Sequence, residues 1–200
     1  MKIVLASNNL GKLAELHPLF APLGVQLVAQ SDVQVPEAAE PYRTFVENAL
    51  AKARNAAAYT GLPAIADDAG LCIDAFGGLP GVDTAYYCVQ FGYPKSDDNN
   101  RRAVLEQMQG LENRRAKMVS TIIAVRSPED PEPLIAVGRV QGEITHVAVG
   151  EHGFGFDPVM FIASLGKTLA QLSPAHKNQI SHRGQSARQM VQLIREHWLS

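Results

Sequence analysis

The stretch that decides the fold is residues 2–12, Lys-Ile-Val-Leu-Ala-Ser-Asn-Asn-Leu-Gly-Lys, where a short apolar run turns into a helical pattern. Residues 3–6 predict a buried strand, which breaks at Ser7-Asn8-Asn9. The apolar residues of the following helix share one face: Leu13, Leu16, Leu19 and Phe20. Pro18 predicts a kink or an early end of this helix. A strand that leads directly into a helix favours the α/β class.

The alternation of strands and helices continues outward from this stretch. Thr44 and Glu47 form a capping-box pattern, which predicts a helix to Tyr59 that ends before Gly61 and Pro63. Further strands are expected at 25–29, at 64–66, ending at Asp67-Asp68, and at 117–126 and 134–149, and further helices at 99–109 and 184–198. Residues 31–42 and 127–133 predict loops. We therefore predict an α/β fold with a mixed sheet and flanking helices.

Composition limits the classes of protein that the chain can belong to. Its 200 residues fit one domain, 1–200, with room for two lobes, and its 46% apolar content is enough for a core. The formal net charge of −2 argues against a nucleic-acid-coating protein. Cys72 and Cys88 are too few for a disulfide framework, and no apolar run approaches a membrane span. We expect a cytoplasmic protein that binds neither membranes nor nucleic acid.

Residues 7–12 form the first motif that can carry chemistry. Backbone N–H groups and the positive end of the helix dipole make a strand-to-helix junction an anion site. Ser7 and Asn9 add donors and Lys12 adds a charge. The segment is no Walker A loop, because Leu13 stands where a magnesium-binding hydroxyl would be. The alternative is an ordinary turn with a capping Asn and a solvated Lys.

Asp67-Asp68-Ala69-Gly70 is the second motif. Neighbouring residues of a strand point to opposite faces, so only one of the two carboxylates can face a given site. A carboxylate at the end of a strand can hold Mg²⁺ or accept a proton from water. The alternative is a turn in which the aspartates make local hydrogen bonds.

Two further motifs lie in the second half of the chain. In residues 153–158, Gly-Phe-Gly-Phe-Asp-Pro, the glycines let the backbone approach a ligand closely and the two phenylalanine rings offer stacking surfaces for a base. The alternative is a glycine-rich bend whose two phenylalanines belong to the core. Lys177 and Ser181-His182-Arg183-Gly184 place cations near the start of the last helix. Alternatively, Ser181 caps that helix and the next two residues form its exposed first turn. Together the four motifs supply a phosphate cradle, a carboxylate, a stacking surface and carbonyl-reading donors.

The chain resembles the inosine triphosphatase family of noncanonical purine nucleoside triphosphate pyrophosphatases over essentially its full length. The matching pieces are SNNLGK, ENALAKA, ADDAG, GGLPG, GFGFDP and KNQISHRG, in the family's order. The resemblance implies an elongated mixed sheet with two lobes around a central substrate groove, assembled as a homodimer. It also implies a Mg²⁺-dependent hydrolase that acts on phosphoric anhydride bonds, converting ITP, dITP or XTP to the monophosphate and pyrophosphate.

The resemblance also implies a role for individual residues. Asp68 would be the catalytic carboxylate and would share the metal with Glu40, although the nearby Glu37 remains an alternative for the second ligand. The triphosphate would lie against Lys52 and the segment Ser7, Asn8, Asn9, Leu10, Gly11 and Lys12, next to Ala69. The base would meet Phe154, Gly155, Phe156, Asp157, Lys177, His182 and Arg183. Two positions depart from the common pattern: Ala69 replaces a hydroxyl residue, and Phe156 replaces a Tyr or Trp.

Two other classes of function stay open at this point. The chain could act on other altered nucleotides, such as modified pyrimidines, or it could bind a nucleotide in regulation without catalysis. A pure binder has little need of a metal carboxylate, which favours the enzyme. A structural or interaction module would leave the glycine-aromatic bend and the cationic helix starts unexplained.

Overall fold

The computed structural model describes residues 1–199, which divide into two compact units. Unit 1 comprises residues 1–68, 120–138 and the segment from His182, and unit 2 comprises Ala69–Val119 and Arg139–Ser181. One seven-stranded sheet has the order β2-β1-β3-β4-β5-β6-β7. β1 is parallel to β2 and β3, whereas β6 is antiparallel to β5 and β7. The predicted α/β class with a mixed sheet is therefore confirmed.

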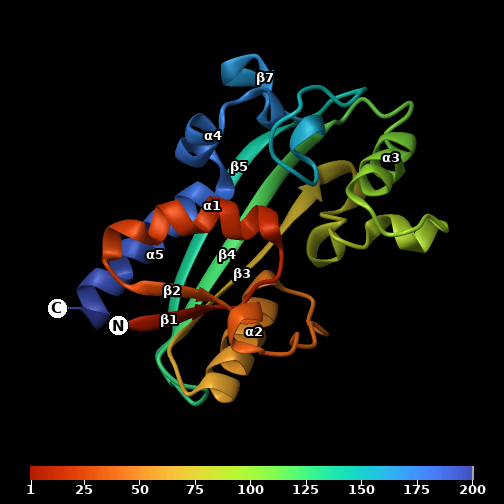
Figure 1. The fold of residues 1–200 in the computed structure, drawn as a ribbon. Coiled ribbons are helices and arrows are strands. Elements are labelled where there is room, and N and C mark those ends of the chain that lie inside the picture. The colour runs from red at the N-terminus through yellow and green to blue at the C-terminus, as the bar shows by residue number, and fades with distance from the viewer. Residues whose placement is uncertain (200) are drawn as a thin grey trace. The chain divides into compact units, whose positions relative to one another are not determined.

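The regular elements follow the sequence patterns in most places (Figure 1). The strands are β1 Lys2–Leu5, β2 Gln26–Ala29, β3 Ala64–Ile73, β4 Arg115–Val125, β5 Leu134–Ile144, β6 Met160–Ile162 and β7 Lys167–Thr168. The helices are α1 Leu10–Phe20, α2 Phe45–Thr60, α3 Asp97–Gln107, α4 Pro174–Ile180 and α5 His182–Trp198. None of the described helices is long and apolar enough to cross a membrane.

In unit 1 the strand alternation sends successive residues to two different apolar layers. Ile3, Leu5 and Ile65 pack with residues of α1 and α5, which lie side by side (Figure 1). Val4, Ala6, Ala64 and Ala66 pack instead with the alanines of α2. Within unit 1, odd-numbered residues of β3 thus face α1 and α5, and even-numbered residues face α2. This parity decides where the two neighbouring aspartates point.

The sequence analysis was wrong about the end of β3. The strand does not stop at Asp67-Asp68 but continues to Ile73. Its pairing with β1 ends at Leu5↔Ile65, so both aspartates lie beyond the last residue of β1. Buried carboxylates are tolerated in a strand when cations pair with them, and here lysine and arginine side chains do so.

The ends of the first two helices show how local signals worked. Thr44 caps α2 by accepting from the Glu47 N–H at 3.3 Å, and Gly61 ends it in the left-handed conformation. α1 ends at Phe20, two residues after Pro18, and a 3₁₀ turn follows. The capping prediction is confirmed, whereas the predicted early end of α1 is wrong, because the helix runs through Pro18 to the last residue of its apolar face.

Three short elements of unit 2, β6, β7 and α4, escaped prediction because each has at most seven residues. Periodicity needs a longer window to be recognised.

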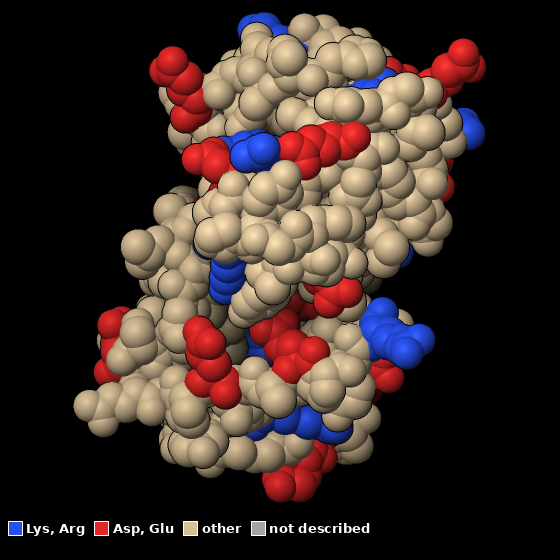
Figure 2. Space-filling view, turned by 90° about the vertical axis from the view of Figure 1, so that its right-hand side faces the viewer, with Lys and Arg blue, Asp and Glu red and all other residues tan. Residues whose placement is uncertain are grey.

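On the viewed face, Figure 2 shows acidic and basic side chains interspersed, without a continuous basic stripe among the described residues. This fits the net charge of −2.

Candidate active site

The loop between β1 and α1 is held beside β3 by backbone hydrogen bonds. The Ala6 N–H donates to the Ile65 carbonyl at 2.8 Å, which continues the strand pairing into the loop. Asn9 caps α1 by accepting from the Lys12 N–H at 3.0 Å, and Ser7 Oγ accepts from the Asn9 N–H at 3.2 Å. Leu10 is exposed. The first turn of α1 therefore presents N–H groups that have no intrahelical acceptor, as an anion site requires.

Lys12 turns from this helix start toward β3. Its ammonium lies 3.0 Å from Asp67 Oδ2 and donates to the Asp67 carbonyl, also at 3.0 Å. Burial lowers the pKa of Lys12, while the charge of Asp67 acts in the opposite direction. The solvated lysine of the alternative interpretation is therefore wrong, because the ammonium is drawn inward against a carboxylate.

Lys52 of α2 lies on the other face of β3 and joins two carboxylates. Its ammonium lies 2.8 Å from Asp68 Oδ1 and 2.9 Å from Glu40 Oε2. Glu40 and Asp68 are therefore within two hydrogen-bond lengths of each other. Glu37 instead accepts from the Asn8 side chain at 3.1 Å. This geometry favours Glu40 over Glu37 as the partner of Asp68.

Asp68 keeps one carboxylate oxygen available. Its Oδ2 is buried and accepts no hydrogen bond from any residue of the described range 1–199. Burial raises the pKa of Asp68, although the charge of Lys52 opposes this. Lys52 itself is affected by burial, which lowers its pKa, but Asp68 and Glu40 together raise it above the ordinary value. A buried, unpartnered carboxylate oxygen calls for a ligand or a water proton.

Asp67, to which the sequence assigned no role in the site, is paired with three side chains of unit 1. Besides Lys12, it accepts from Ser120 Oγ at 2.5 Å and from Arg183 Nε at 3.2 Å. Burial tends to raise its pKa, but the charges of Lys12 and Arg183 outweigh this effect and lower it. Asp67 and Asp68 point to opposite faces, as the strand alternation predicted. That same parity was the one signal that could have identified Asp67.

The head of α5 is buried rather than exposed. His182 and Arg183 are 2% and 3% exposed, so the alternative of an exposed first turn is wrong. Arg183 Nη1 donates to Glu15 at 2.6 Å, in addition to its bond to Asp67. Gly138 of β5 packs so closely that an added Cβ would lie 1.9 Å from the His182 carbonyl. The structure thus brings Arg183 together with Lys12 around the Asp67 carboxylate. The predicted role of Arg183 in binding a purine stays a prediction.

Unit 2 holds the glycine-aromatic motif. Asp157 is buried, accepts from the Phe154 N–H at 2.9 Å and pairs closely with the buried Lys177 ammonium. That ammonium also lies 5.1 Å from the centre of the Phe154 ring. Phe156 is 2% exposed within the apolar core, which favours the alternative of a core ring, whereas Phe154 is partly exposed. The predicted base-binding roles of these residues stay predictions.

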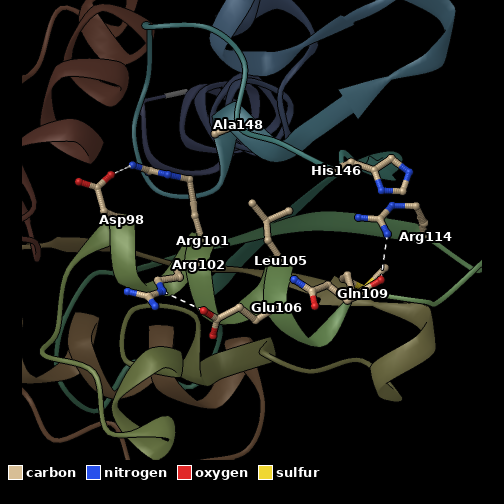
Figure 3. Close-up of a pocket in the computed structure, with 10 residues that line it drawn as sticks. Asp98, Arg101, Arg102, Leu105, Glu106, Gln109, Arg114, His146 and Ala148 are labelled. Atoms are coloured by element: carbon tan, nitrogen blue, oxygen red, sulfur yellow. Dashed lines mark hydrogen bonds and ion pairs between the residues drawn. The ribbon is translucent and has the colours of Figure 1, made fainter.

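A separate pocket in unit 2 has a volume of about 370 Å³ and none of the predicted site residues in its wall (Figure 3). Arg101 pairs with Asp98, and Arg102 Nε lies 2.8 Å from Glu106. Arg114 donates to the backbone carbonyls of Met108, Ile144 and Thr145. The guanidinium groups that line this pocket therefore bind neighbouring carboxylates and backbone carbonyls.

Fold and site together define a mixed α/β protein with a lysine–carboxylate site on the third strand of the chain. The Ham1 family model matches residues 3–193. The chain belongs to the Ham1 family. It is 68% identical to a dITP/XTP pyrophosphatase of Acidovorax sp., covering 100% of this chain and 98% of that protein, and 67% identical to one of Delftia acidovorans, covering 100% of each.

Solved structures agree with this assignment. A HAM1 protein from Coxiella burnetii superposes with a TM-score of 0.90 at 41% identity, covering 98% of this chain and 99% of the other. The nucleoside-triphosphatase / dITP/XTP pyrophosphatase from Mycobacterium abscessus gives a TM-score of 0.74 at 38% identity, covering 97% and 99%. The resemblance inferred from six short motifs is confirmed by full-length similarity.

Proposed function

We propose that this chain is a nucleoside triphosphate pyrophosphatase that converts dITP, ITP and XTP to the monophosphate and pyrophosphate. The observation that carries the proposal is the pairing of cations and carboxylates on both faces of β3, where Lys12 pairs with Asp67 and Lys52 pairs with Asp68 and Glu40. The dITP/XTP pyrophosphatase names of relatives about two thirds identical support the same activity. Such an enzyme would remove deaminated purines from the nucleotide pool. That the protein acts in the cytoplasm and forms a homodimer stays a prediction.

A divalent metal ion, Mg²⁺, fits the residues present. Asp68 Oδ2 is buried without a partner in the described range, and Glu40 lies nearby on Lys52. The described residues contain no group of three side chains suited to hold a metal. Mg²⁺ commonly uses one or two carboxylates plus water and substrate phosphates. When bound, the ion would neutralise the polyphosphate and stabilise charge on the leaving group.

The side chains of the site account for the remaining steps of hydrolysis. The α1 start and Lys12 would bind phosphate oxygens, and Lys52 would orient Asp68. Burial raises the pKa of Asp68, which makes its carboxylate a better proton acceptor than a solvated aspartate. Asp68 would take a proton from the water that attacks the α-phosphorus, and pyrophosphate would leave.

Base selection follows from hydrogen-bond polarity. Hypoxanthine and xanthine present a carbonyl at C6, whereas adenine presents an amino group. Donors of the His182-Arg183 region would donate to this carbonyl. Against adenine they would face another donor and stay unpaired, at a cost of about 1–3 kcal/mol per contact. Guanine shares the C6 carbonyl, so GTP must be rejected at its C2 amino group.

A substrate panel tests the proposed function. We expect kcat/KM for dITP, ITP and XTP to exceed that for ATP by about tenfold to a few hundredfold per lost contact, with GTP also disfavoured. The measurement is pyrophosphate release with added Mg²⁺, and dUTP and dTTP in the same panel test the pyrimidine alternative. Equal kcat/KM for ITP and ATP would contradict the proposed specificity, and no pyrophosphate release from any substrate would leave a nucleotide-binding protein.

A further inference from the structure

Asp67 has no role in the reaction described so far, yet it is in direct contact with the Lys12 ammonium. Both its carboxylate and its own backbone carbonyl lie 3.0 Å from Lys12 Nζ. An ammonium has three N–H donors. Two of them point to a single residue, and the third remains for an oxygen of an incoming phosphate. Lysine carries a long and flexible side chain, so this double contact fixes an ammonium that would otherwise sample many positions.

The Asp67 carboxylate is in turn held from the opposite side. Ser120 Oγ donates to its Oδ1 at 2.5 Å and lies 2.7 Å from Ser186 Oγ. Ser186 Oγ donates to the Arg183 carbonyl at 3.1 Å, and Arg183 Nε donates to Asp67 Oδ2 at 3.2 Å. β3, β4 and the first turn of α5 are thereby joined in a closed network. The carboxylate has little freedom to rotate, so the position of Lys12 is defined by the fold.

A carboxylate, and not an amide, suits this position. Asp67 is the shared anion of two cations, the partly buried Lys12 and the buried Arg183. The second anion, Glu15, contacts Arg183. If Asp67 were neutral, the Lys12 ammonium would face the Arg183 guanidinium without an intervening negative charge, and like charges in a buried site repel strongly. Lys12 would then move away from the place where it can meet a phosphate.

We propose that Asp67 is a positioning residue, which holds the Lys12 ammonium in place for the triphosphate and acts on the reaction only through Lys12. The inference rests on the proposed function. A displacement of about 1 Å in a group that binds the reacting part of a substrate can lower the rate about 100-fold. Asp67 is therefore a determinant of turnover although it does not touch the substrate.

A double-mutant cycle in the full-length protein separates this role from a merely structural one. Asp67→Asn, Lys12→Ala and the double variant are assayed for pyrophosphate release from dITP. We expect Asp67→Asn to lower kcat/KM about 100-fold in the parent background, but by no more than about threefold when Lys12 is already alanine. Losses that multiply in the double variant would overturn the proposal, as would an Asp67→Asn enzyme within about threefold of the parent.

Two controls keep the result interpretable. Asp130→Asn is a matched change, because Asp130 is also a buried carboxylate of unit 1. It accepts from the backbone N–H groups of Arg126 and Glu132 and does not contact Lys12. We expect the activity of this variant to stay within about threefold of the parent. If circular dichroism shows that Asp67→Asn is unfolded, Ser120→Ala replaces it in the same cycle. This change keeps the charge, and we expect an approximately tenfold loss that disappears beside Lys12→Ala; a loss that persists overturns the proposal.

The cycle also distinguishes the two levels of inference. A parent protein that releases no pyrophosphate from any triphosphate in the panel refutes the proposed function. An active parent with independent effects of Asp67 and Lys12 refutes only the positioning role.

Discussion

Replacement of Asp68 by asparagine is expected to lower kcat/KM for dITP by about 10³-fold or more. The Asp68→Asn change removes the proton acceptor, a contribution typically of about 10²–10⁴-fold, and also one of the two carboxylates available to a metal. It leaves the shape of the side chain unchanged in a strand whose neighbours are apolar and closely packed. The measurement is pyrophosphate release under saturating Mg²⁺.

Folding must be checked beside this rate. Asp68 is paired with Lys52 at 2.8 Å, so the variant loses one ion pair and some stability. Circular dichroism should nevertheless show the parent spectrum at the assay temperature, and Asp130→Asn provides a matched buried substitution outside the site. If a folded Asp68→Asn enzyme kept activity within about tenfold of the parent, proton transfer to Asp68 would be excluded as a main source of the rate.

The second large effect is expected in the metal requirement of Glu40→Gln. Within the described residues, Lys52 joins Asp68 to one other carboxylate, that of Glu40. An amide is a weaker ligand for Mg²⁺ than a carboxylate. We expect the Mg²⁺ concentration for half-maximal pyrophosphate release to rise about 10–100-fold, in the range found when groups that support a metal are removed.

Glu37→Gln is the matched control for this experiment. Glu37 lies three positions earlier in the same loop, and its carboxylate accepts from Asn8, a bond that an amide oxygen can keep. We expect its Mg²⁺ requirement to stay within about threefold of the parent, as for most surface substitutions. Reversed outcomes for the two variants would assign the second metal carboxylate to Glu37.

Local signals were sufficient for much of the fold. The apolar run at residues 3–6 predicted β1, Asn9 and Thr44 capped their helices, and Gly61 ended α2. Each of these features depends on neighbours a few positions away. The predicted strand at 64–66 was shorter than β3, because two adjacent aspartates usually end a strand. The cations that compensate them come from distant parts of the chain: Lys12 is 55 positions from Asp67 and Arg183 is 116.

The candidate site divides in the same way. Lys12, Lys52, Asp68 and Glu40 were predicted from motifs and resemblance. The structure joins Lys52 with Asp68 and Glu40, whereas Lys12 pairs with Asp67 on the other face of β3. The role of Asp67 as the shared partner of Lys12 and Arg183 could not be predicted, because motif spacing does not show which buried groups meet. The two phenylalanines of the glycine-aromatic motif also differ in exposure, since Phe156 is buried and Phe154 is partly exposed. The sequence alone does not distinguish them.

The central claim is that water attacks the α-phosphorus of a noncanonical purine triphosphate at the lysine–carboxylate site. Hydrolysis of dITP in ¹⁸O-labelled water, followed by ³¹P NMR or mass spectrometry of the products, tests it most directly. We predict dIMP and pyrophosphate in equal amounts, with the label in dIMP alone. Label in pyrophosphate, or formation of dIDP and orthophosphate, would contradict the claim.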